Sequence, residues 1–174
     1  MSVAELVVTK GGLKYILIGT AGKELFLFSL PSFELMGQLK LQQSVHAVNF
    51  IANGFALVAV QDRLISIGIN KNSIENLGES DQRFPEIWSI RKMENRPEEY
   101  VLGSKDGLRF ITFRHTSNSY KPVLDIETQQ PLILLSGRQT LQVKEIAPDL
   151  LLTADYNMPG YFLVNRASRE IRHI

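Results

Sequence analysis

The chain has 174 residues, of which 44% are hydrophobic and 21% are charged, and its formal net charge is +1. A chain of this length buries about 70% of its unfolded surface, so we expect a packed core without disulfides or a structural metal. The absence of cysteine excludes thiolate zinc sites, iron–sulfur clusters and cysteine nucleophiles. The near-neutral charge creates no overall field that attracts nucleic acid. No apolar run reaches the roughly 20 residues of a membrane-spanning helix. We therefore expect an intracellular protein without a membrane span, cytoplasmic, with a nuclear location left open.

Short apolar runs separated by Gly, Asn, Asp and Pro predict an all-β fold. Most runs have four to six residues, fewer than the 10–12 that favour a helix, and many are rich in Val, Ile, Phe and Tyr. In chain order, the expected strands are 4–9, 14–19, 24–30 and 34–41, then 46–51, 55–60, 63–69 and 73–77, then 86–92, 99–103, 108–113 and 120–126, and finally 141–147, 149–154, 161–165 and 169–174.

These runs repeat in groups of four. Tight turns between the second and third strands are expected at Gly22, Asp62, Asp106 and Asn157, at separations of 40, 44 and 51 residues. This spacing is close to the 40–45 residues of a four-stranded propeller blade. We therefore expect one domain over residues 1–174, with blades at about 3–42, 45–78, 86–127 and 141–174.

The second and third repeats carry a family resemblance. Residues 46–50 with 55–67, and residues 87–90 with 99–110, resemble WD-type blades, and Gly-Ser-Lys-Asp-Gly at 103–107 is the most specific piece. An Asp-Gly pair suits such a tight turn because glycine adopts a positive φ without strain. The Trp-Asp dipeptide that ends the third strand of such blades is missing throughout. The chain therefore resembles a divergent WD-repeat-like β-propeller.

Four blades are the minimum for a closed propeller. We expect these residues to be part of a larger propeller, with a complete four-bladed ring and a β-sandwich as the alternatives. The end blades should then expose apolar faces, expected at Leu25, Leu27 and Leu30 in the first blade and at Tyr161, Leu163 and Ile171 in the last. The segment 132–135 is either an arm of a hairpin that changes the register of the fourth blade or an insertion in a long loop.

The sequence contains none of the local motifs that carry catalysis, a cofactor or a metal. Its three histidines, His46, His115 and His173, lie far apart, without the spacing of a metal site. The Gly-rich segment 19–24 lacks the Ser or Thr that follows the lysine of a phosphate-binding loop. We therefore expect no enzyme activity, no cofactor and no metal.

Propeller topology places the turns between second and third strands, and the linkers between blades, on one face. On that face we expect protein contacts through six residues: Arg83, Phe84, Lys105, Asp106, Arg138 and Met158. The resulting hypothesis is a non-catalytic scaffold that binds protein partners or additional propeller blades, as a homo- or hetero-oligomer in a multi-protein assembly. One alternative is a ligand-binding or enzymatic propeller with a site at its channel mouth, where Asp62, Lys105 and Asp106 are the polar groups. Another, nucleic-acid or phosphoinositide binding, is disfavoured because no aromatic residues alternate with the arginines near the end of the chain.

Overall fold

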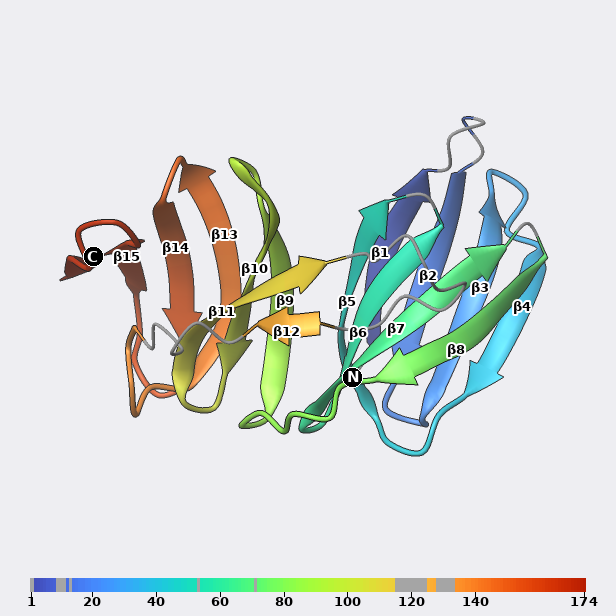
Figure 1. Cartoon of the computed structure of the whole chain (residues 1–174), viewed down its shortest axis with the longest axis horizontal. Helices are drawn as coiled ribbons and strands as arrows, with labels where there is room; N and C mark the ends of the chain where they lie inside the picture. Colours follow the sequence, from blue (N-terminus) through green and yellow to red (C-terminus); the bar gives the residue numbers. More distant parts are fainter. Residues whose placement is uncertain are drawn as a thin grey trace. The chain divides into compact units, whose positions relative to one another are not determined.

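The computed structural model describes residues 2–8, 12, 14–52, 54–70, 72–114, 125–127 and 134–174. All regular secondary structure in these ranges is β-strand (Figure 1). The strands form four antiparallel sheets, and each sheet contains four strands that are consecutive in the sequence. The prediction of an all-β chain with four four-stranded repeats is confirmed.

The strand bounds agree with the expected runs to within a few residues. The first sheet contains β1 (Ser2–Val8), β2 (Lys14–Thr20), β3 (Glu24–Leu30) and β4 (Leu35–Lys40). The second contains β5 (Val45–Ala52), β6 (Phe55–Val60), β7 (Arg63–Asn70) and β8 (Ser73–Glu79). The third contains β9 (Ile87–Met93), β10 (Arg96–Ser104), β11 (Gly107–Arg114) and β12 (Asp125–Glu127). The fourth contains β13 (Thr140–Ala147), β14 (Leu150–Asp155), β15 (Tyr161–Asn165) and β16 (Ile171–His173). Part of the strand expected at 120–126 lies outside the described residues.

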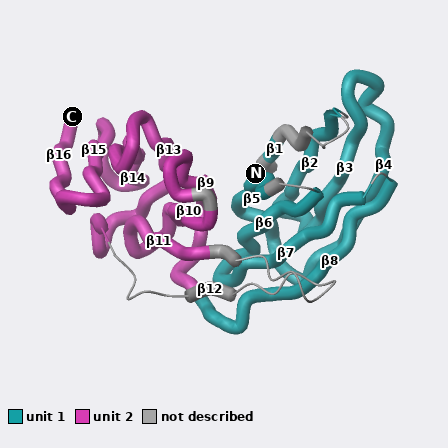
Figure 2. Tube along the Cα trace, turned by 45° about the horizontal axis from the view of Figure 1, so that its top comes forward, with its two compact units in different colours: residues 1–83, 115–124 teal, residues 84–114, 125–174 magenta. Residues whose placement is uncertain are grey.

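The sheets belong to two compact units (Figure 2). Unit 1 covers residues 1–83 and 115–124, and unit 2 covers residues 84–114 and 125–174. In unit 1, β5 lies against β1 and β2, and β8 lies against β4. In unit 2, β13 lies against β9 and β10. Each unit therefore contains two sheets in contact, which is how sheets with an apolar face exclude water.

Each unit has its own core. In unit 1 the largest fully buried side chains of the first sheet are Leu17, Leu25 and Leu27, and they pack in one cluster with residues of the second sheet such as Val58 and Ile67. The core of unit 2 combines residues from β9–β11 with residues from β13–β15, for example Met93, Val101, Phe110, Val143, Leu151 and Phe162. Successive residues of a strand point to opposite faces of its sheet. The core of each unit is therefore formed by side chains from one face of each of its two sheets.

The first and last sheets are closed on one face only. Along β6 and β7 nearly every residue is buried, so both faces of the second sheet are covered. Along β2 and β3, and along β14 and β15, buried residues alternate with partly exposed ones.

Of the three residues that we expected on the half-open face of the first sheet, only Leu30 lies there. Leu25 and Leu27 are completely buried, because their side of the sheet packs on the second sheet. The half-open face instead carries Ile16 opposite Phe28 and Ile18 opposite Phe26. In the last sheet, Tyr161 and Leu163 lie on the half-open face as expected, but Ile171 pairs with buried Val164 on the other face.

The segment before β13 contributes to the core of unit 2. Leu134 forms an isolated antiparallel bridge with Leu108 at the start of β11, and both Leu134 and Leu135 are buried. In the described residues this segment therefore pairs with the third sheet and not with β13. The alternative of a hairpin that shifts the fourth repeat is wrong, and β13 begins within one residue of the expected position.

Candidate protein-interaction surface

In each sheet, the turn between the second and third strands lies beside the linker that follows or precedes the sheet. We call these turns and linkers the rim. In unit 1, the hydroxyl of Ser44 donates a 2.8 Å hydrogen bond to the carbonyl of Ala21, which joins the β4–β5 linker to the β2–β3 turn. In the second sheet, the guanidinium of Arg83 binds the carboxylate of Asp62 and thereby joins the β8–β9 linker to the β6–β7 turn. The expected sharing of one face by turns and linkers is thus present in both sheets of unit 1.

Arg83 lies at the edge of a small polar hollow in unit 1. The hollow has a volume of about 190 Å³ and is also lined by Arg63 and Glu79. These two side chains form an ion pair of 3.2 Å. The side chain of Arg83 is 62% exposed. Ion pairs this open to water contribute little to stability, so Arg83 is available to a partner at small cost.

The third sheet has the most extensively bonded rim turn. One oxygen of the Asp106 carboxylate accepts a 3.0 Å hydrogen bond from the backbone N–H of Gly137, and the other accepts one of 3.2 Å from Arg109. The backbone N–H of Gly107 donates to the carbonyl of Arg138 at 2.7 Å. These bonds fasten the β10–β11 turn to the segment before β13.

The same contacts set the charge of Asp106. The backbone N–H of Gly137, together with the guanidinium of Arg109, lowers the pKa of the Asp106 carboxyl below its usual value, although partial burial opposes this shift. Hydrogen bonds to a carboxylate favour its ionised form. The turn therefore carries a fixed negative charge beside Lys105, whose side chain is exposed.

A second group in unit 2 surrounds Arg138. Its guanidinium contacts the sulfur of Met158 and lies over the ring of Phe162, 5.3 Å from the ring centroid. Met158 packs against the core of the unit. The β14–β15 turn also displays Tyr156, which is 67% exposed and donates its backbone N–H to the carbonyl of Gln139 at 2.8 Å. An exposed aromatic ring on a hydrogen-bonded turn is typical of protein-binding surfaces.

The six expected contact residues therefore have different surroundings. Lys105, Asp106, Arg138 and Met158 lie on the rim of unit 2, and Arg83 lies on the rim of unit 1. Phe84 is only 5% exposed, so its expected place on the exposed face is wrong: burial of its large apolar ring outweighs its position in a linker. Tyr156 was missed. The signal for it was an aromatic residue inside a predicted turn.

The opposite edge of unit 2 contains ion pairs that join the third and fourth sheets. Arg96 binds the carboxylate of Asp149 at 3.2 Å, and Arg166 binds the largely buried carboxylate of Glu99. The guanidinium of Arg166 also lies over the ring of Phe110, 5.0 Å from its centroid. Nearby, Arg172 pairs with Glu170. Arg166 and Arg172 are therefore both paired with carboxylates.

Among the described residues, no group of three or more His, Asp or Glu side chains is placed to hold a metal ion. None of the described residues belongs to a helix that is long and apolar enough to cross a membrane. The polar groups considered for a channel-mouth site belong to different units. Asp62 is bound by Arg83 in unit 1, whereas Lys105 and Asp106 belong to a turn of unit 2.

Comparison with known proteins identifies the fold. No family model and no curated protein matches the sequence. Among solved structures, the chain is similar to the β-propeller domain of Cps50 (Swd1) from Myceliophteria thermophila, with a TM-score of 0.60 over 97% of this chain and 71% of that one. The fold is a β-propeller. The two sequences are only 11% identical, so the similarity concerns the fold alone. It confirms the predicted β-propeller architecture of about four blades, and each sheet described above is one blade.

Proposed function

We propose that this propeller is a non-catalytic scaffold that works inside the cell, with a rim that binds protein partners within a multi-protein assembly. The observation that carries the proposal is the rim of unit 2, where Lys105 and Tyr156 are exposed on turns that hydrogen bonds hold in place. A surface already ordered before binding loses less conformational entropy on association. Aromatic and cationic side chains on such a surface are the usual energetic centres of protein interfaces.

We further propose that residues 1–174 act as one propeller segment whose end blades are covered by additional blades or by another chain. The half-open faces of the first and last sheets support this, because their apolar rows have the composition of a covered sheet face. The alignment with 71% of the Cps50 (Swd1) domain also supports it, since that propeller domain is longer than the part that this chain matches.

The scaffold proposal is tested by comparing what the protein and its variants bind in the source cells. We would co-purify proteins with the tagged chain, with Lys105→Glu and with Tyr156→Ala, and quantify each protein by mass spectrometry. A matched control is Glu34→Lys, a charge reversal in the exposed β3–β4 turn. A rim partner should be depleted about tenfold by both rim variants, and it should be retained by the control. Recovery of the same proteins in the same amounts with all four baits would refute the proposal.

A further inference from the structure

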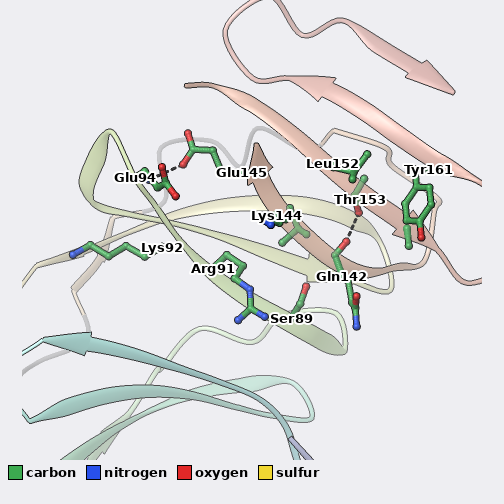
Figure 3. A pocket seen from close by; sticks show the side chains of 12 residues that line it. Ser89, Arg91, Lys92, Glu94, Gln142, Lys144, Glu145, Leu152, Thr153 and Tyr161 are labelled. Atoms are coloured by element: carbon green, nitrogen blue, oxygen red, sulfur yellow. Dashed lines mark hydrogen bonds between the residues drawn. The ribbon is translucent and has the colours of Figure 1, made fainter. Parts of the chain in front are cut away.

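Unit 2 contains a second feature that the scaffold role does not use. A hollow of about 510 Å³ lies around the first strands of its two sheets, β9 and β13, and extends to β14 and β15 (Figure 3). Binding sites for small molecules typically have volumes of 300–1,000 Å³. The hollow is therefore large enough for an organic molecule, and its lining indicates which class of molecule.

The charges of the lining are separated. The hollow has three cationic side chains, Arg91, Lys92 and Lys144, and two carboxylates, Glu94 and Glu145. Figure 3 shows the two carboxylates together at one end, whereas Arg91 lies at the other end with Ser89 and Gln142.

The contacts of Glu145, Lys92 and Lys144 leave the two lysines available to bind an anion. The two oxygens of Glu145 accept the backbone N–H groups of Glu94 and Asp149, at 2.6 and 3.2 Å, so this carboxylate is already engaged. Lys92 and Lys144 make no ion pair with any residue that the structure describes. The two lysines therefore bring to the hollow positive charge that no described carboxylate pairs with.

The floor of the cationic end has a hydroxyl without a partner. Ser89 is only 7% exposed, and its side-chain oxygen makes no hydrogen bond within the described part of the chain. Ser89 pairs with Gly103 on β10, and a Cβ atom at Gly103 would lie 2.3 Å from that oxygen. Glycine at 103 thus makes the space that the hydroxyl occupies. A buried hydroxyl that lacks a partner is costly, and rotation of this side chain toward an acceptor in the hollow would remove that cost.

The remaining wall is apolar. Leu152 and Ala154 on β14 line the hollow together with Tyr161 on β15, a residue that is 52% exposed. All three side chains lie on the half-open face of the last sheet. A flat apolar body placed against them would cover an aromatic surface that now faces water.

We propose that this hollow binds a small organic oxyanion, with a phosphate or carboxylate group at the cationic end and a flat apolar body against Tyr161. Lys144 provides the charge that is not paired within the described chain, Gln142 and Ser89 provide hydrogen-bond donors, and the apolar wall adds affinity that an inorganic ion does not gain. This site is separate from the rim. Its apolar wall belongs to the half-open face of the last sheet, so the ligand and a blade or chain that covers that face exclude each other.

The test is a titration of the full chain followed by amide NMR, with phenyl phosphate and benzoate as the probes that distinguish the two oxyanions. Saturable shifts of β9 and β13 amides are expected for at least one of them, with a dissociation constant of about 1 mM, as suits ligands of this size. Inorganic phosphate should bind at least about threefold more weakly, and phenol should not shift these amides. Absence of saturable shifts at about 10 mM of either probe would overturn the proposal.

Two variants separate a specific site from general attraction of anions. Lys144→Gln should weaken binding of the better probe by about fivefold, because it removes a cation from the lining. The matched control, Lys40→Gln, changes an exposed lysine in unit 1 and should leave the dissociation constant unchanged. An equal loss with both variants would show that net charge alone attracts the probe, and would overturn the site. The amide spectra of both variants report directly that they remain folded.

Discussion

Gly107 connects the rim turn of the third blade to the core of unit 2, and its replacement should be among the most destabilising single changes in the chain. Its φ is +88°, a conformation that side chains of L-residues rarely adopt. A Cβ atom at this position would lie 2.5 Å from the carbonyl oxygens of both Leu134 and Leu135. Both obstacles are backbone atoms, so no side-chain rotation relieves the contact.

The loss of stability can be estimated from the positive φ and from the close contacts of the Cβ atom. The positive φ costs an alanine about 1–2 kcal/mol. Moving the 134–135 backbone away also weakens two hydrogen bonds, from Gly107 N–H to Arg138 and from Leu108 N–H to Leu134, at 2.7 and 2.8 Å. Each is worth about 1 kcal/mol. Gly107→Ala should therefore lower the free energy of unfolding of unit 2 by about 3–4 kcal/mol, and Gly107→Val by more.

Gly137 provides a matched control in the same unit. Its φ is +75°, but a Cβ atom there would meet nothing within 4 Å, so Gly137→Ala should cost only the backbone strain, about 1–2 kcal/mol. The stability of both variants can be measured by urea denaturation. The signal is the fluorescence of Trp88, which is the only tryptophan and lies in unit 2. The midpoints should differ by about 1 M urea. Coinciding midpoints would show that close packing on Leu134 and Leu135 contributes nothing, and would refute the reasoning.

Three further predictions concern charged and titrating groups of unit 2. Glu99→Gln should lower the free energy of unfolding, measured by thermal denaturation, by about 2–4 kcal/mol because it leaves the largely buried Arg166 without its carboxylate. Glu170→Gln, which changes an exposed pair, should lower it by less than about 0.5 kcal/mol. Similar losses of stability in the two variants would contradict this prediction. The pKa of Asp106 is lowered in the folded chain, mainly by the N–H of Gly137. The ionised carboxylate therefore stabilises the fold above the ordinary carboxyl pKa of about 4, and this contribution is lost as the pH falls. Asp106→Asn should accordingly flatten the acid limb of a plot of urea midpoint against pH, and an unchanged limb would count against the contact. Burial raises the pKa of Tyr100 to about 12; because the unfolded tyrosine ionises near pH 10, stability should fall as the pH rises from there toward 12. Tyr100→Phe should remove part of this alkaline loss in the same denaturation assay, and identical alkaline curves would argue against it.

The sequence was sufficient for the features that depend on neighbouring residues in the chain. Strand length, turn position and the division into four-stranded repeats follow from short apolar runs and from turn residues such as Asp106 and Gly107, and all of these are local signals. A strand contains its own period of two, so the rows that form its two faces were also readable. For the same reason the sequence placed Lys105 and Asp106 correctly in a turn.

The tertiary structure alone decided which of these rows is covered. The apolar run over Leu25–Leu30 has hydrophobic side chains on both faces, and nothing within the run distinguishes the face that packs on the second sheet from the one that stays half open. Phe84 is buried although it lies in a linker, and Arg166 pairs with Glu99 across 67 residues. Such contacts depend on where a distant strand comes to lie, and the free energy of burial is gained only after the sheets have met.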